Sequence, residues 1–96
     1  MTETSFDAVK VYYENKILRF IGQNDSLCMI PLINVSSFLL YENCFIVLLN
    51  NGCKITICYN TYTKDFAEPI TRFIIEWKSQ FHSIAVDLLN ISPPYT

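Results

Sequence analysis

The spacing of the apolar residues changes near residue 60, and this change constrains the fold more than any other feature of the sequence. Between residues 8 and 59 the apolar residues follow period two or form short runs, broken at close intervals by Asn, Asp, Gly and Ser. This pattern is typical of successive short strands. We therefore predict an α+β fold, in which an antiparallel β-meander of roughly five or six short strands over residues 8–59 precedes one long C-terminal helix.

The C-terminal third of the chain carries one apolar stripe with helical spacing. Its members are Phe66, Ile70, Phe73, Ile74, Trp77 and Phe81. Asp65, followed three residues later by Glu68, has the form of a capping box, and Pro69 is tolerated in a first helical turn. We predict a helix over about residues 65–89, with Phe66, Ile70, Phe73 and Trp77 in the core.

The predicted helix is longer than the sheet that it would cover. A helix of about 24 residues spans roughly 36 Å, whereas a strand of about seven residues spans roughly 23 Å. Either the helix bends near His82, or its last turns carry apolar side chains onto another chain. We favour another chain, with interface residues Ile84, Leu88 and Leu89.

The pair Asn51-Gly52 predicts a hairpin with a two-residue type I′ turn, because both residues tolerate positive φ. The predicted core face of that hairpin comprises Ile46, Leu48, Ile55 and Ile57. The opposite face would hold Phe45, Val47, Leu49, Thr56 and Cys58. Because this second face is too apolar to meet water alone, we predict that it is an interface. Pro31 cannot donate to a ladder, so its strand is predicted at an edge or a bend.

The chemically reactive residues do not form a catalytic or metal-binding pattern. Cys28, Cys44, Cys53 and Cys58 contain no C-x-x-C spacing, and Cys53 and Cys58 point to opposite faces by strand parity. We interpret the four cysteines as reduced, buried thiols. His82 is the only histidine, and no phosphate-binding motif occurs, so we predict neither an enzyme nor a cofactor or metal site.

Charge and terminal composition limit the partners and the compartment. A net charge of -2 with scattered Lys and Arg disfavours nucleic acid and anionic membranes. Residues 1–7 lack the features of a signal peptide, and no apolar run is long enough for a membrane span. We expect one domain over residues 1–96, with flexible tails at 1–7 and 91–96, in the cytoplasm. An excess of Ile and Asn over Ala and Gly is typical of AT-rich genomes, such as those of low-GC bacteria, their phages and some large viruses. A viral or phage accessory protein in a host cytoplasm is one source that agrees with this bias.

The order of several short segments resembles small bacterial pleckstrin-homology-like domains. These segments are Ile30-Pro31-Leu32, Val35-Ser36-Ser37, Asn50-Asn51-Gly52 and the C-terminal helix, so that the resemblance covers roughly residues 17–81. It implies a non-catalytic scaffold that binds a protein, a lipid headgroup or another small ligand. The basic phosphoinositide pocket of that family has no counterpart here, and a whirly-type single-strand-binding fold is an alternative.

Three functions follow, in order of preference. The first is a non-enzymatic interaction module that self-associates, with a dimer favoured, and binds a protein partner. The second is a ligand-sequestering or regulatory binder, encoded by a phage or mobile element, with its pocket between protomers. The third is single-stranded nucleic-acid binding, which the aromatic content invites and the absence of a basic groove disfavours.

Overall fold

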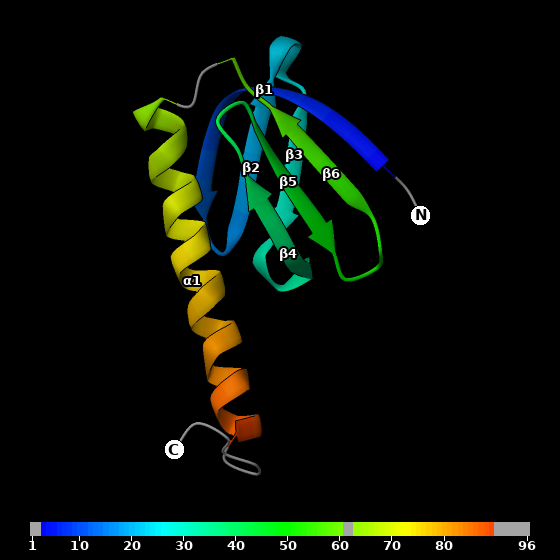
Figure 1. Cartoon of the computed structure of the whole chain (residues 1–96). Coiled ribbons are helices and arrows are strands. Elements are labelled where there is room, and N and C mark those ends of the chain that lie inside the picture. The colour runs from blue at the N-terminus through cyan, green and yellow to red at the C-terminus, as the bar shows by residue number, and fades with distance from the viewer. Residues whose placement is uncertain (1–2, 61–62, 90–96) are drawn as a thin grey trace.

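The structure of the protein, a computed structural model, describes residues 3–60 and 63–89, and of residues 81–89 it describes the backbone alone. It has α+β architecture (Figure 1). The strands and the helix are β1 (Glu3–Glu14), β2 (Ile17–Gly22), β3 (Leu27–Pro31), β4 (Val35–Leu40), β5 (Cys44–Leu49), β6 (Lys54–Cys58) and α1 (Lys64–Leu89). Short 3-10 turns at Gln23–Asp25 and Leu32–Asn34 flank β3.

The six strands form one sheet in the order β3-β2-β1-β6-β5-β4. All neighbouring pairs are antiparallel except β1 and β6, which are parallel. The sheet is therefore not the single meander that the sequence predicts, but two meanders of three strands joined by a parallel pair. Residues 3–7, expected in a flexible tail, form this parallel pair with β6, whereas residues 91–96 lie outside the described part of the chain.

Strand β1 bends where it changes partner. It pairs with β6 as far as Asp7 and with β2 from Ala8, and its register then shifts between Ala8 and Lys10. Val9 is therefore an extra residue in β1, and an extra residue of this kind bends a strand and increases its twist. Gly22 lies at this bend, where a Cβ atom would come within 2.8 Å of the Asp7 carbonyl oxygen, so only glycine fits without a shift of the backbone.

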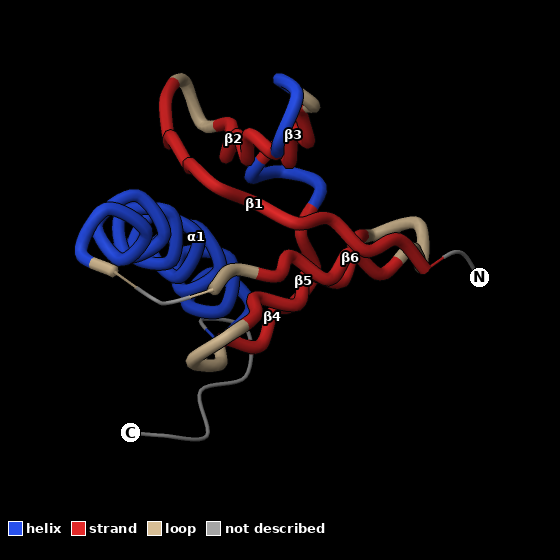
Figure 2. Tube along the Cα trace, turned by 90° about the horizontal axis from the view of Figure 1, so that it is seen from above, coloured by secondary structure: helices blue, strands red, loops and turns tan. Residues whose placement is uncertain are grey.

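The sheet is curled, because its two edge strands are neighbours in sequence. Strands β3 and β4 stand at opposite ends of the strand order, yet only Leu32–Asn34 separates them. Three residues span at most roughly 10 Å, so the two edges approach each other at this end. Figure 2 shows the two meanders opening like a V, with α1 lying along the opening. The edge position predicted from Pro31 is confirmed for β3.

The hairpin of β5 and β6 differs from the prediction by one residue. Leu48 lies opposite Lys54, and Phe45 lies opposite Ile57. The Leu49 N–H donates to the Cys53 carbonyl at 2.9 Å, so Asn50 joins Asn51 and Gly52 in a three-residue loop. Gly52 has φ +90°, as the left-handed residue of such loops requires. A slip of one residue exchanges the two faces of a strand, so the predicted faces are wrong along β5.

The core lies between the inner face of the sheet and α1. Its buried apolar side chains are Ala8, Val11, Tyr13, Leu18, Phe20, Ile30, Leu32, Val35, Phe45, Val47, Ile57, Tyr59, Phe66, Ile70 and Phe73. Ile57, Phe66, Ile70 and Phe73 are thus buried as predicted. Ile55 and Trp77 are half-buried against this core. Ile46 is half-buried on the other face, and Leu48 is exposed, so their placement in the core was wrong.

Helix α1 begins one residue before the predicted start. The Thr63 carbonyl accepts hydrogen bonds from Phe66 N–H at 3.1 Å and Ala67 N–H at 2.9 Å, so Thr63 rather than Asp65 stands before the first turn. The described part of the helix runs to Leu89 and continues past the end of the sheet (Figure 1). Among the described residues, no helix combines the length and the apolar character needed to cross a membrane.

Candidate functional site

The outer face of the β4–β5–β6 meander is the main apolar surface outside the core. Phe45, Val47 and Ile57 point into the core, so the residues between them along β5 and β6 point outward. The register places outward side chains of β4, β5 and β6 side by side, together with Ser37 and Lys54, and we call six of them the β4–β6 outer face. They are Leu39, Cys44, Ile46, Leu48, Thr56 and Cys58.

The six side chains are themselves uncharged, but Lys54 lies opposite Leu48 on the same side of the sheet. Leu39 is 52% exposed and Leu48 is 36% exposed, whereas the other four members are half-buried. The nearest ion pair, between Lys54 and Glu3 at 3.6 Å, lies at its margin beside Leu48. An apolar face of this kind is more typical of a contact surface than of a surface that meets water alone.

The predicted interface residues are divided between the two faces. Thr56 and Cys58 belong to the β4–β6 outer face. Phe45 and Val47 are fully buried in the core of the chain, and Leu49 is half-buried against it, so these three residues were assigned to the wrong face. The one-residue change in the hairpin loop is the cause. The side chains of Ile84, Leu88 and Leu89 lie outside the described residues.

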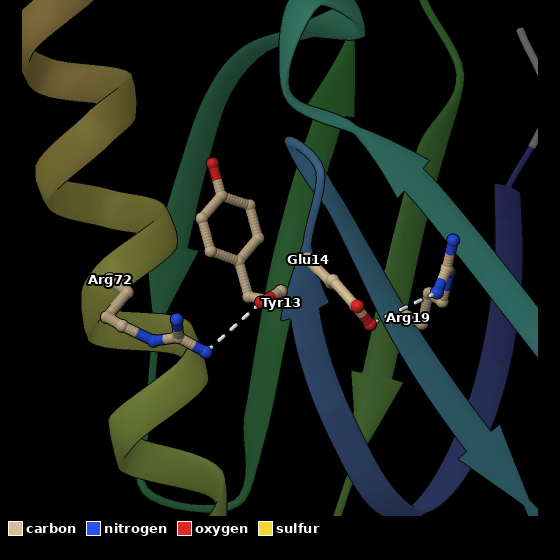
Figure 3. A network of polar contacts seen from close by, with 4 residues as sticks. All are labelled: Tyr13, Glu14, Arg19 and Arg72. Carbon is tan, nitrogen blue, oxygen red and sulfur yellow. Dashed lines mark hydrogen bonds and ion pairs between the residues drawn. The ribbon is translucent and has the colours of Figure 1, made fainter.

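The outer face of the β1–β2–β3 meander has a mixed character. Tyr12, Leu27 and Met29 are exposed there. Charged side chains lie among them, because Arg19 stands between Tyr12 and Met29 across the three strands. Arg19 also pairs with Glu14 at 3.7 Å (Figure 3). This second face therefore combines apolar area with charges of both signs.

A polar cluster joins α1 to β1. The Arg72 guanidinium donates to the Tyr13 carbonyl oxygen at 3.1 Å, as Figure 3 shows, and lies 5.8 Å from the centre of the Tyr13 ring. The Tyr13 hydroxyl donates to the Glu76 carboxylate. Burial, reinforced by this hydrogen bond, raises the pKa of Tyr13 well above its usual value. Sequence reasoning missed this cluster, although Arg72 and Glu76 have the i, i+4 spacing of helical neighbours. Its geometry anchors the helix.

Trp77 joins the same helix to the edge strand β4. Its Nε1–H donates to the Val35 carbonyl oxygen at 2.8 Å. Its ring packs edge-on against the Phe38 ring, with the two ring centres 5.0 Å apart. The helix is therefore attached to both meanders, to β1 through Tyr13 and to β4 through Val35 and Phe38. This attachment covers the inner face and leaves both outer faces open.

An open depression of about 490 Å³ lies at the bend of β1. Its lining residues are Phe6, Asp7, Ala8, Val9, Gln23, Ser26, Cys58, Tyr59 and Asn60. Volumes of about 300–1,000 Å³ are usual for small-molecule sites. Cys58 is the one member that also belongs to the β4–β6 outer face, so the depression and that face adjoin.

The four cysteines are free and half-buried. Burial raises the pKa of the Cys28 thiol, which packs against the core. Among the described side chains, no three His, Cys, Asp or Glu residues are grouped as metal ligands, and the His82 side chain lies outside them. Comparison of this chain with protein-family models, with curated proteins and with solved structures finds no match.

Proposed function

We propose that the chain is a non-enzymatic interaction module that forms a homodimer through the β4–β6 outer face and also binds a protein partner. The observation that carries this proposal is an apolar patch centred on Leu39 and Leu48, which no other part of the described chain covers, and beside which Lys54 is paired with Glu3. In a two-fold dimer the same patch meets itself. The six members of the patch carry no charge, and the adjoining Lys54 is already paired with Glu3, so the self-contact brings no unpaired like charges of these residues together and the best occupant is a second copy.

The edge strand β4 supports the same occupant. Natural edge strands are usually protected from pairing by Lys, Pro, other charges or bulges. Strand β4 has a register shift near its start, between Val35 and Ser37, but Phe38, Leu39 and Leu40 carry no charge and no proline. Leu39 and Leu40, the last two residues of this strand, are both exposed. Apolar surface therefore extends from the β4–β6 outer face to the edge of the sheet.

The protein partner fits the other outer face better. Interfaces between different proteins are about as polar as the rest of a protein surface, whereas homodimer interfaces are more apolar. The β1–β2–β3 meander offers that mixed composition, with Tyr12 and Met29 beside Arg19. The resemblance to pleckstrin-homology-like scaffolds stays a prediction that agrees with this use, and we propose a cytoplasmic location for the module.

Sedimentation equilibrium tests the dimer. The wild type should sediment as a dimer at micromolar concentration, and Leu39→Glu should sediment as a monomer, because each copy then brings a carboxylate into the apolar contact. Met29→Glu is the matched control, since Met29 is 46% exposed on the other outer face, and it should remain dimeric. A monomeric wild type, or equal dissociation by both variants, contradicts the proposal. Circular dichroism verifies that each variant is folded.

A second candidate function is the binding of a small ligand in the depression at the bend of β1. Its volume of about 490 Å³ and its polar lining, with Asp7, Gln23 and Ser26, favour this candidate. All of its lining residues belong to one chain, whereas the ligand pocket predicted from the sequence lies between protomers. A thermal-shift screen with nucleotides and similar metabolites tests it, because a ligand that binds only the folded chain raises Tm. A ligand that stabilises the wild type but not Ser26→Leu supports the site, and a screen without stabilisation rejects it.

A further inference from the structure

Two of the four cysteines lie directly opposite each other on neighbouring strands. The register pairs Cys44 of β5 with Cys58 of β6. Their neighbours Phe45 and Ile57 are fully buried in the core, so both cysteines point to the outer face. Both are free and half-buried. The two-residue turn predicted from Asn51-Gly52 would instead have placed Tyr59 opposite Cys44, which is why sequence reasoning missed this pair.

The backbone hydrogen bonds identify Cys44 and Cys58 as a non-hydrogen-bonded pair. The Tyr59 N–H donates to the Asn43 carbonyl at 3.2 Å, and hydrogen-bonded pairs alternate with non-hydrogen-bonded pairs along an antiparallel ladder. The Cys44 carbonyl accepts instead from the Tyr41 N–H at 2.8 Å, so the backbone of Cys44 bonds towards β4 rather than β6. The residues of a non-hydrogen-bonded pair have Cα atoms about 4.5 Å apart, which lies within the usual range of about 4.4–6.8 Å for disulfides.

We propose that Cys44 and Cys58 form a site of reversible disulfide formation within one chain. The chemical class of the reactant is a low-molecular-weight disulfide such as oxidised glutathione. Cys58 lines the depression at the bend of β1, which gives a small molecule a route of approach to this residue. Cys44 is then the resolving residue, since it lies opposite Cys58 on the same face.

The exchange balances in two steps. The Cys58 thiolate attacks one sulfur of oxidised glutathione, so that a mixed disulfide forms and one glutathione thiolate leaves. The Cys44 thiolate then attacks the Cys58 sulfur, and the second glutathione thiolate leaves as the Cys44–Cys58 bond forms. Two protein thiols are oxidised and one glutathione disulfide is reduced to two thiols, with the two protons of the protein thiols passing to solvent or to glutathione. Excess reduced glutathione reverses the sequence.

This site does not depend on the proposed dimer, because both sulfurs belong to one chain. It concerns the same face, however, since Cys44 and Cys58 are members of the β4–β6 outer face. Disulfides in cytosolic proteins are usually transient and redox-sensing, and exposed disulfides are the ones that reductants reach most readily. A half-buried pair at the surface meets that description better than an enclosed one.

Peptide mapping without reduction tests the site in the full-length chain. After reduction, removal of the reductant and exposure to oxidised glutathione, the free thiols are alkylated and the chain is digested. We expect two of the four thiols to be protected from alkylation, one peptide pair linked through Cys44 and Cys58 in the monomeric species, and full recovery of both thiols with reduced glutathione.

Variants separate this pair from the other cysteines. The double variant Cys28→Ser, Cys53→Ser should form the same linked peptide as the wild type. Cys44→Ser and Cys44→Ala should each stop at the mixed disulfide on Cys58. Stable glutathione on Cys58 in the wild type, a bridge that includes Cys28 or Cys53, or linkage between chains only would overturn the proposal.

Discussion

The substitution Phe45→Ala measures which face of β5 lies in the core. The Phe45 side chain is fully buried, and its ring lies 5.8 to 6.3 Å from the rings of Phe38, Phe73 and Phe20. Removal of a buried phenylalanine ring costs about 3–5 kcal/mol, because burial is lost and a cavity remains. The total free energy of unfolding of a small domain is about 5–15 kcal/mol, so this loss is a large part of it. For a domain of this size the same loss lowers Tm by roughly 12–40 °C.

Leu48→Ala is the matched comparison on the neighbouring face. Leu48 is already exposed, so its truncation should cost below about 1 kcal/mol. Urea unfolding followed by the fluorescence of Trp77, the only tryptophan, measures both variants, with Phe45→Leu added as a milder change. Two protein concentrations separate unfolding from dissociation. A larger loss for Leu48→Ala than for Phe45→Ala would refute the register and restore the two-residue turn.

Three further perturbations follow from the geometry of individual residues. Because the pKa of Tyr13 is raised in the folded chain, the folded state keeps a proton that the unfolded state loses above about pH 10, so urea midpoints should fall above that pH and Tyr13→Phe should flatten the fall. Gly22→Ala places a Cβ atom 2.8 Å from the Asp7 carbonyl and should cost about 1–3 kcal/mol, whereas Gly52→Ala meets no atom within 4 Å and should cost about 1–2 kcal/mol through backbone strain alone. Urea unfolding measures both variants, and an unchanged stability of Gly22→Ala would contradict the close contact with the Asp7 carbonyl. Trp77→Phe loses the hydrogen bond to the Val35 carbonyl and should cost about 0.5–1.5 kcal/mol, measured by thermal unfolding with circular dichroism.

The features that the sequence predicts correctly are those that local patterns determine. The apolar stripe from Phe66 to Phe81 specifies a helix through contacts one turn apart, and the structure has α1 over nearly the expected range. Pro31 marks an edge strand because its missing N–H would leave a gap in a ladder.

The parallel pairing of β1 with β6 has no local signal. Residues 3–7 include Glu3, Thr4 and Ser5, a polar run that resembles a tail when it is examined alone. Their strand conformation depends on hydrogen bonds to β6, some fifty residues away in the chain, and on the bend at Val9 that directs the second half of β1 to β2. Such pairings depend on the whole fold rather than on propensity, because a strand is stabilised by its neighbours.

The loop between β5 and β6 shows how a distant contact can override a strong local preference. Asn51-Gly52 alone favours a two-residue turn. In the structure the Asn50 N–H donates to the Asn34 carbonyl at 2.8 Å, and the Asn50 side chain donates to the Ile33 carbonyl at 2.9 Å. These bonds hold Asn50 against the turn between β3 and β4, so Asn50 becomes part of the loop instead of the last residue of the ladder.

This one-residue difference connects the core, the outer face and the cysteine pair. Only the register that buries Phe45 exposes Leu48, and only that register sets Cys44 opposite Cys58. Stability measurements on Phe45→Ala and Leu48→Ala, and disulfide mapping of Cys44 and Cys58, therefore report on the same alignment through independent quantities. A stable Phe45→Ala together with a linked Cys44–Cys58 peptide would be inconsistent, since no single register of β5 and β6 produces both results.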